Sequence, residues 1–228
     1  MWATRPLRQG RGMTTPTLDA PARSRSLRRS WPVPVGLILL AFVPVIAGSM
    51  RVAEIASGAA ITAENARFFD SPVPVVAHIV CSALYLVLGA LQFIPSLRRR
   101  RWHRFAGRVL VPAGLVSAFS GIWMAVAYDL PAVNGPALTV IRVGLGALMA
   151  AGLVIAVVAI GRRNVRVHRA WMIRSYAIGL GAGTQVFTLM PMMLDLGIPE
   201  TAKYTILMAA GWGINMVVAE LAIRRGPR

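Results

Sequence analysis

The chain has little charge and only one cysteine. Charged residues make up 14% of its 228 residues, whereas an ordinary soluble domain carries about 25%. Hydrophobic residues make up 56%, and the mean hydropathy is +0.61. The single cysteine, Cys81, excludes an internal disulfide framework. This composition predicts a protein that is surrounded by lipid rather than by water.

Lysine is nearly absent as well, although the formal net charge is +17. All of the 25 basic residues except Lys203 are Arg, a bias typical of GC-rich bacterial genomes. A charge of this size often indicates nucleic-acid binding. Here, however, the Arg residues stand in short clusters between long apolar runs. We therefore expect no nucleic-acid partner, and we expect a bacterial source.

The apolar runs have the length and the pattern of membrane-spanning helices. A helix needs about 20 mostly apolar residues to cross the roughly 30 Å hydrocarbon core of a bilayer. The runs are continuous rather than alternating, which favours helices over the strands of a barrel. Six segments meet the requirement: 33–50, 73–95, 105–128, 137–160, 171–194 and 204–222. The sequence thus predicts an all-α, polytopic bundle in the cell membrane, with one transmembrane domain over 33–222.

The basic residues orient these six predicted spans. With six spans, 21 of the 24 Arg residues fall on one side of the membrane and six of the eight acidic residues fall on the other. The side rich in Arg is cytoplasmic under the positive-inside rule. Five or seven spans would divide the Arg clusters between the two sides. We therefore predict six spans with both chain ends in the cytoplasm.

Both ends of the chain are polar and basic. Residues 1–32 are rich in Arg, Ser and Pro, which is typical of a disordered segment. Residues 223–228 form a second, shorter basic end. Basic segments beside a membrane are attracted to the anionic lipids of the inner leaflet. The expected partner of the long tail is therefore the inner surface of the bilayer.

Two predicted cytoplasmic turns resemble one another. They read RRRRWHRFAGR over 98–108 and RRNVRVHRAWMIR over 162–174, and each contains a His-Arg pair. The likeness suggests a parallel repeat of two helical hairpins. The competing interpretation is that short basic turns are common in membrane proteins and arise independently.

The histidines of these turns are candidate ligands at the inner membrane surface. Imidazole nitrogens bind Fe, Cu and Zn, and two histidines suffice for a six-coordinate haem whose propionates neighbouring Arg residues would hold. The candidate cofactor residues are His103, His168, His78, Arg104, Arg169 and Arg174, with His103 and His168 as metal ligands. The alternative is that the turns are ordinary basic anchors beside an aromatic belt.

One face of the second predicted span is polar. His78, Ser82, Tyr85, Gly89 and Gln92 recur every three or four residues and therefore share one helical face. Ionisable groups in a membrane face the bundle interior or a wet cavity. His78 is then either a ligand, a proton relay or a substrate contact, or it makes an interhelical hydrogen bond that orients packing.

Two charged residues lie inside other predicted spans. Arg142, in the fourth span, either reaches the outer headgroups, pairs with an acid of the outer loops, or binds an anionic group. Glu220 lies near the inner end of the sixth span. We expect it to pair with Arg224 or with an Arg of a neighbouring turn.

Glycines form stripes on two predicted spans. Gly107, Gly114 and Gly121 have heptad spacing, and Gly179 and Gly183 form a GxxxG pair. Small residues allow helix backbones to approach closely. The stripes predict packing faces, either inside the bundle or toward a second copy or another membrane protein.

Three runs of the sequence form a set of motifs: HIVCSALYLVLGALQFIPSLRRRRWHRFAGRV, VHRAWMIRSYA and GWGINMVVAE. Together they resemble the bacterial membrane family catalogued as domain of unknown function 2306, over about residues 70–222. The elements HRxxGR and HRxWMxRSYA are specific in combination. The resemblance implies the helical membrane fold and places these residues at motif positions: His78, Gln92, His103, Arg104, Gly107, Arg108, His168, Arg169, Trp171, Arg174 and Glu220.

Three functions remain open at this point. A redox or metal-linked membrane protein would use His103 and His168, with haem or a transition metal as its cofactor. An accessory or assembly subunit would bind another membrane protein through its glycine faces. A small-solute transporter would line its path with Arg142 and His78. The redox hypothesis leads, and the residues leave open whether the protein is an enzyme.

Overall fold

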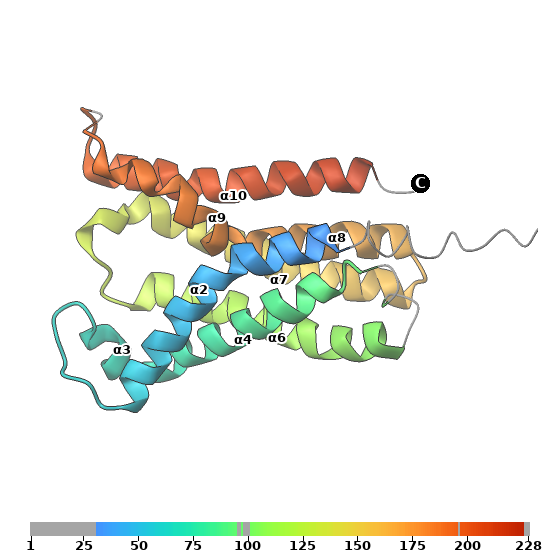
Figure 1. Cartoon of the computed structure of the whole chain (residues 1–228), viewed down its shortest axis with the longest axis horizontal. Coiled ribbons are helices and arrows are strands. Elements are labelled where there is room, and N and C mark those ends of the chain that lie inside the picture. Colours follow the sequence, from blue (N-terminus) through green and yellow to red (C-terminus); the bar gives the residue numbers. More distant parts are fainter. Residues whose placement is uncertain (1–30, 95–96, 98–100, 196, 226–228) are drawn as a thin grey trace, which may run out of the picture.

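The computed structural model describes residues 31–94, 97, 101–195 and 197–225. The predicted disordered tail therefore falls almost wholly outside the described residues, as does the end of the predicted basic C-terminus. Every regular element in the described residues is a helix (Figure 1). The elements are α2 (Pro32–Ala56), α3 (Ala66–Asp70), α4 (Pro72–Leu91), α6 (Arg101–Ala127), η1 (Ala132–Asn134), α7 (Gly135–Gly161), α8 (Val165–Gly179), α9 (Gly181–Thr188), η2 (Met190–Met193) and α10 (Glu200–Arg224).

Five helical segments are long and apolar enough to cross a membrane: α2, α4, α6, α7 together with η1, and α10. Each contains most of one predicted span, so the all-α membrane fold is confirmed for these five. Most of the helices continue past the apolar runs that predicted them. α2, for example, ends at Ala56 rather than at residue 50, and Arg51 and Glu54 form an ion pair one turn apart in this extension.

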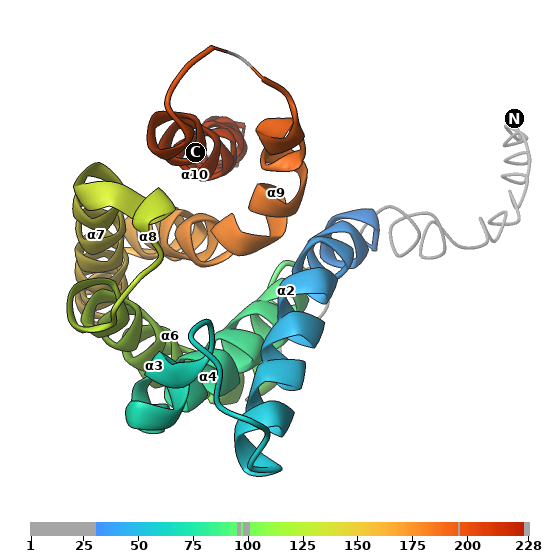
Figure 2. The ribbon, with the colours of Figure 1, turned by 90° about the vertical axis from the view of Figure 1, so that its left-hand side faces the viewer.

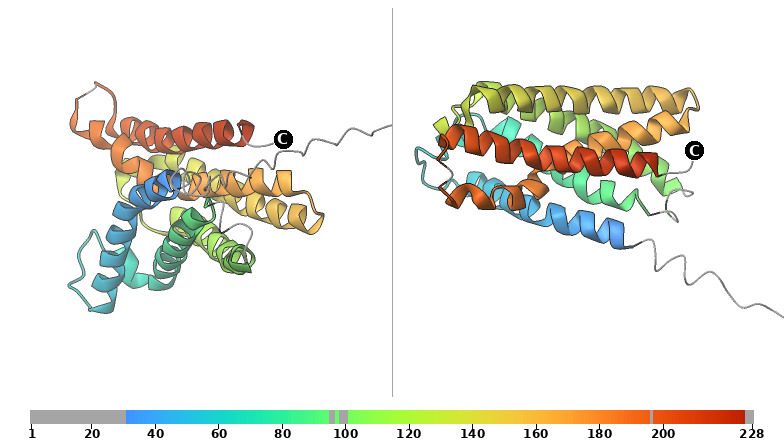
Figure 3. Two further views of the ribbon diagram at one scale, coloured as in Figure 1. Left: turned by 45° about the vertical axis from the view of Figure 1, so that its right-hand side comes forward. Right: turned by 90° about the horizontal axis from the view of Figure 1, so that it is seen from above.

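The long helices lie along one axis, so the bundle has two ends (Figures 1 and 3). One end carries the turn between α7 and α8, with Arg162 and Arg163, and the last residues of α10, with Arg224. We call this the basic end. The opposite end, which carries the connections 57–71, 128–134 and 189–199, is called the distal end.

Seen from the distal end, the helices form a ring with α10 beside it (Figure 2). Chain neighbours pack side by side, with α2 on α4, α4 on α6, α6 on α7 and α7 on α8. Short connections between antiparallel helices produce this arrangement. α9 contacts α2 and closes the ring, and α10 packs against α7, α8 and α9.

The fifth predicted span differs from a continuous helix over 171–194. α8 ends at Gly179, and α9 runs only from Gly181 to Thr188. Glycine lowers helix propensity by about 1 kcal/mol relative to Ala, and this segment has three glycines in five residues, 179, 181 and 183. The helix is therefore interrupted at Leu180, between two of these glycines.

The two halves of the interrupted segment share α10 as a neighbour but differ in their other contacts. α8 packs against α7, α10 and α4, whereas α9 packs against α10 and α2. In the distal half of the bundle the fifth segment is thus turned away from α4, α6 and α7. This change of direction leaves space inside the ring at the distal end.

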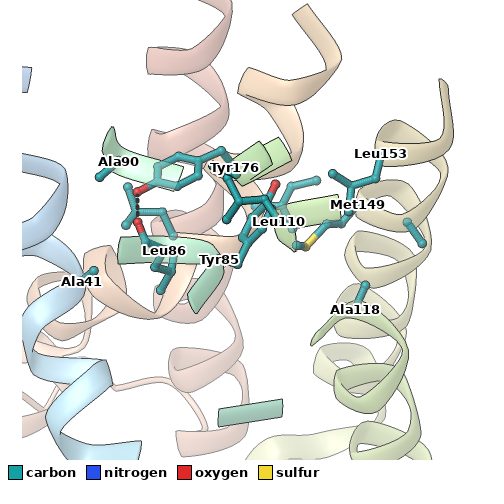
Figure 4. Packing of buried hydrophobic residues seen from close by; sticks show 13 residues of the cluster. Ala41, Tyr85, Leu86, Ala90, Leu110, Ala118, Met149, Leu153 and Tyr176 are labelled. Carbon is teal, nitrogen blue, oxygen red and sulfur yellow. Dashed lines mark hydrogen bonds between the residues drawn. The ribbon is translucent and has the colours of Figure 1, made fainter. Parts of the chain in front are cut away.

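Next to that space lies a buried hydrophobic core that includes Tyr85 and Tyr176 (Figure 4). Tyr85 of α4 is 2% exposed, and its ring centroid lies 5.8 Å from that of Tyr176 on α8. The Tyr176 hydroxyl donates to the carbonyl oxygen of Leu86 at 2.8 Å. A Cβ atom on Gly89 would lie 2.6 Å from the Tyr176 ring, and one on Gly114 would lie 2.9 Å from the Tyr85 ring. Both positions therefore require glycine for this packing.

The predicted glycine packing faces are confirmed inside the bundle at all but one position. Gly114 and Gly179 contact Tyr85, Gly121 contacts His78, and a side chain on Gly183 would meet the backbone of α2. Gly107 is the exception, because nothing lies within 4 Å of where its Cβ would be. These stripes pack helices of one chain together.

Candidate functional site

A cavity of about 480 Å³ occupies the distal half of the bundle. Its walls come from α4, α6, α7, α8, α9 and α10, and the connection 128–134 and α3 contribute residues near its distal side. The lining combines apolar side chains, such as Met149 and Trp212, with a few polar ones. Concave sites of this kind are the usual form of a small-molecule site.

Arg142 brings a positive charge to the wall of this cavity. It lies about two turns into α7, and Tyr204 of α10 lines the same cavity. Among the described residues, no carboxylate lies within ion-pairing distance of Arg142. The predicted pairing with an acid of the outer loops is therefore not found in this part of the chain.

Two acidic residues of the distal end form ion pairs with other cations than Arg142. Glu54 pairs with Arg51, and Glu200 pairs with Lys203 at 2.7 Å. Of the residues that line the cavity, two are arginines and none is acidic. The lining that the structure describes is therefore cationic.

His78 lines the cavity from α4. Its Nδ1 lies 2.8 Å from the carbonyl oxygen of Ser117 and 3.2 Å from Oγ of Ser120, both on α6. Gly121 makes room for the ring, because a Cβ there would lie 3.1 Å from Cε1 of His78. Ser82, one turn along α4, shares a hydrogen bond of 2.7 Å with the Ser117 hydroxyl. The predicted polar face of this helix thus faces the bundle interior.

The distal side of the cavity is held by aromatic contacts. The Tyr128 hydroxyl donates to the carbonyl oxygen of Ser71 at 2.6 Å, which ties the end of α6 to the start of α4. The Tyr128 ring meets the Phe68 ring edge to face, with centroids 5.8 Å apart. The Arg67 guanidinium lies 4.5 Å from the centroid of the same Phe68 ring. These contacts fix the short helix α3 beside the cavity.

Several polar lining residues were not predicted from the sequence, among them Asn134, Gln185 and Tyr204. Gln185 is 6% exposed, and its Nε2 donates to the carbonyl oxygen of Met208 at 3.0 Å. Nδ2 of Asn134 donates to Pro131 O at 3.0 Å. An amide within the apolar run GAGTQVFTLM was the available signal for Gln185. Tyr204 carried no such signal, because tyrosine is ordinary near the end of a span.

Tyr85 and Gln92, which share a helical face with His78, lie deeper than the cavity. Neither belongs to the cavity lining. The Tyr85 ring packs beside Gly179 and Met149, both of which do line it. The Tyr85 hydroxyl is buried without a hydrogen-bond partner among the described residues. Tyr85 therefore lies next to the cavity lining but outside the cavity itself.

The candidate histidine ligands lie toward the basic end. Nδ1 of His168 lies 2.9 Å from the carbonyl oxygen of Ala156 on α7, and His103 is a partly buried residue in the first turn of α6. Within the described residues, no group of three or more His, Cys, Asp or Glu side chains is placed to hold a metal ion. Convergence of His103 and His168 on one ligand stays a prediction.

Two of the candidate arginines at this end, Arg169 and Arg174, contact α10. Arg169 donates to the carbonyl oxygens of Ala222 and Ile223 at 3.1 and 3.5 Å, near the C-terminus of α10. Nε of Arg174 lies 2.6 Å from Oε1 of Glu220. Glu220 thus pairs with an Arg of a neighbouring turn, the second of the two expected partners. Arg104 is exposed on α6.

Residues 75–223 match the model of a family described as predicted membrane protein (DUF2306). The chain belongs to this family. The match agrees with the resemblance over about residues 70–222. No curated protein and no solved structure matches the chain significantly.

The family match covers nearly all of the cavity. Of its lining residues, only Arg67 and Phe68 lie before residue 75, where the match begins. α2, which contributes no lining residue, lies wholly before the match. The matched part of the chain thus contains both His78 and Arg142.

Proposed function

We propose that this membrane protein binds a small organic anion in the distal cavity. We further propose that the chain crosses the bilayer six times, with the basic end in the cytoplasm, so that the cavity belongs to the extracytoplasmic half. The observation that carries the proposal is Arg142, a guanidinium in a cationic cavity without a carboxylate partner among the described residues.

The cost of burying a charge supports an anionic ligand. A charged side chain within a membrane costs several kcal/mol unless it is paired or hydrated. Tyr204, which lines the same cavity, carries no charge that would compensate that of Arg142. A ligand carboxylate would supply that charge and could accept two parallel N–H bonds from the guanidinium. Arg142 therefore favours carboxylate ligands over neutral ones of the same shape.

The rest of the lining supports an organic ligand rather than an inorganic ion. Leu145, Met149, Met208 and Trp212 give the cavity an apolar and aromatic surface. An inorganic anion would leave this apolar surface in contact with water. The apolar part of an organic ligand would bury it, which contributes about 25 cal/mol of binding free energy per Å². The volume of about 480 Å³ is in the range of ordinary small-molecule sites.

The arrangement of the arginines supports six crossings. The turn 162–164 and the end of α10 lie at the basic end, while α9 and the connection after it lie toward the distal end (Figure 1). The interrupted segment α8–α9 thus leads from one end toward the other, as a spanning segment does. Interrupted helices at mid-membrane depth are characteristic of binding sites in membrane proteins.

A binding measurement on the protein in nanodiscs tests the proposed ligand class. Acetate, lactate and benzoate would be titrated, each against its neutral amide. We expect at least one carboxylate to bind saturably and its amide to bind at least about tenfold more weakly. Arg142→Gln should abolish that difference. Arg166→Gln, an exposed arginine at the basic end, is the matched control and should preserve it. Equal binding of acid and amide, or carboxylate binding that survives Arg142→Gln, would refute the proposal.

One observation favours the redox hypothesis as a second candidate. Because Nδ1 of His168 bonds a backbone carbonyl, its Nε2 is the nitrogen available to a metal, as in many metal-bound histidines. His168 could therefore serve as one ligand of a metal or haem iron. Whether His103 binds the same metal is untested. Absorption spectra and elemental analysis of detergent-purified protein would decide: a Soret band or a bound metal that is lost in both His103→Ala and His168→Ala supports this candidate. A preparation without either excludes it.

A further inference from the structure

The surroundings of His78 determine which of its ring nitrogens carries the proton. Nδ1 lies 2.8 Å from the carbonyl oxygen of Ser117. A carbonyl oxygen can only accept a hydrogen bond. Nδ1 is therefore the protonated nitrogen of the neutral imidazole, and Nε2 carries the lone pair.

The second neighbour of Nδ1 leads to the same assignment. Oγ of Ser120 lies 3.2 Å from Nδ1, but its single proton is donated to a backbone carbonyl, with that of Val116 at 2.6 Å and that of Ser117 at 3.2 Å. That hydroxyl can then only accept from Nδ1. Both contacts require the same tautomer, so α6 fixes the orientation of the His78 ring.

Nε2 is consequently a hydrogen-bond acceptor in the cavity wall. His78 lines the cavity, and no hydrogen bond of its Nε2 is found among the described residues. The hydroxyls of Ser82 and Ser117 bond one another at 2.7 Å beside it. Nε2 is thus an acceptor on this wall that has no partner from the described chain.

We propose that Nε2 of His78 accepts a hydrogen bond from a hydroxyl or N–H group of the ligand, at the end away from its carboxylate. The inference rests on the proposed binding of an organic anion at Arg142. A lone pair repels a carboxylate, so the carboxylate goes to Arg142 and the donor to His78. α6 packs between α4 and α7 in the ring, so the two side chains enter the cavity from different walls. The ligand class is therefore an organic acid with a separate hydrogen-bond donor.

Two ligand pairs test this assignment in nanodiscs. 4-Hydroxybenzoate is compared with benzoate, and 3-(4-hydroxyphenyl)propionate with 3-phenylpropionate, so that two separations of carboxylate and hydroxyl are sampled. 4-Methoxybenzoate, which accepts but cannot donate, controls for size and polarity. In the unmodified protein we expect one hydroxylated acid to bind about tenfold more tightly than its partner, and the methoxy compound to show no such gain.

His78→Asn is the decisive variant. The Asn side-chain amide reaches the position of Nδ1 and can donate to Ser117 O, but it places no acceptor where Nε2 was. We expect it to keep the affinity for the unhydroxylated acid within about twofold and to lose the preference for the hydroxyl. His78→Gln, whose longer amide reaches the position of Nε2, should restore part of that preference.

The outcomes separate this inference from the proposed function. Arg142-dependent binding of benzoate or 3-phenylpropionate without a hydroxyl preference overturns the role of His78 and leaves the anion site standing. A preference that persists in His78→Asn overturns it as well. If no acid binds, or if binding ignores Arg142→Gln, both proposals fail.

Discussion

The hydroxyl of Thr184 on α9 donates to Oδ1 of Asn215 on α10 at 2.7 Å, with both side chains buried. Nδ2 of the same Asn215 donates to the carbonyl oxygen of Ala177 at 3.1 Å. Ala177 belongs to the last turn of α8, whose carbonyls lack partners within the helix. One amide therefore fastens both halves of the interrupted segment to α10, and it holds α9 in the direction that opens the cavity.

Replacing Asn215 should destabilise the bundle and weaken ligand binding together. We expect Asn215→Leu to lower the free energy of unfolding by about 1–2 kcal/mol, because a buried carbonyl and a buried hydroxyl lose their partner. Thermal unfolding in detergent and benzoate affinity would be measured on the same sample. Thr184→Val removes only the hydrogen bond to Asn215 and should lower the free energy of unfolding by less. Val217→Ala, at an exposed position of the same helix, is the control and should change neither stability nor affinity. If Asn215→Leu unfolds at the same temperature as Val217→Ala, Asn215 does not fasten the interrupted segment.

The glycine stripe of α6 provides a comparison within one helix. A Cβ on Gly114 would lie 2.8 Å from Cδ1 of Leu153 and 2.9 Å from the ring of Tyr85, whereas nothing lies within 4 Å of a Cβ on Gly107. We expect Gly114→Ala to lower stability by about 1–3 kcal/mol through overpacking. Gly107→Ala should be neutral or stabilising, because Ala has the higher helix propensity. Equal melting temperatures for the two variants would show that Tyr85 can move aside.

The ion pair between Arg174 and Glu220 links α8 to α10 near the basic end. Two contacts join the side chains, at 2.6 Å and 3.1 Å, and their side chains are 27% and 35% exposed. Partial exposure reduces the strength of such a pair, although the bidentate geometry favours it. A double-mutant cycle with Arg174→Gln and Glu220→Gln should give a coupling of about 1 kcal/mol in unfolding experiments. A coupling indistinguishable from zero would mean that packing alone holds these helices together.

Much of the helical fold could be predicted from apolar runs because a bilayer requires long continuous helices. The ends of the helices were predicted less well. Arg51 and Glu54 interrupt the apolar run but continue α2 by pairing with each other. The interruption at Leu180 was missed for a different reason. The sequence shows glycines that allow a break, but the contact from Asn215 that stabilises it comes from another helix.

The candidate site could be predicted residue by residue but not as a site. His78 and Arg142 stood out because ionisable groups are rare in apolar spans. That they line the same cavity depends on the direction of α9, which tertiary contacts determine. His103 and His168 were favoured as candidates because the similarity of the two basic turns can be recognised in the sequence, whereas a cavity formed by several helices cannot.

Cysteine labelling can decide how many times the chain crosses the membrane, because Cys81 is its only cysteine. In a Cys81→Ala background, single cysteines would replace Asp129, Arg162 and Asp195, which are all exposed. With six spans, a membrane-impermeant maleimide should label positions 129 and 195 in intact cells, and position 162 only after permeabilisation. Position 195 is the informative one. If α8 and α9 do not cross the bilayer together, it lies on the same side as position 162 and is protected with it. Labelling of 129 without 195 would therefore establish five crossings and place the two ends of the chain on opposite sides of the membrane.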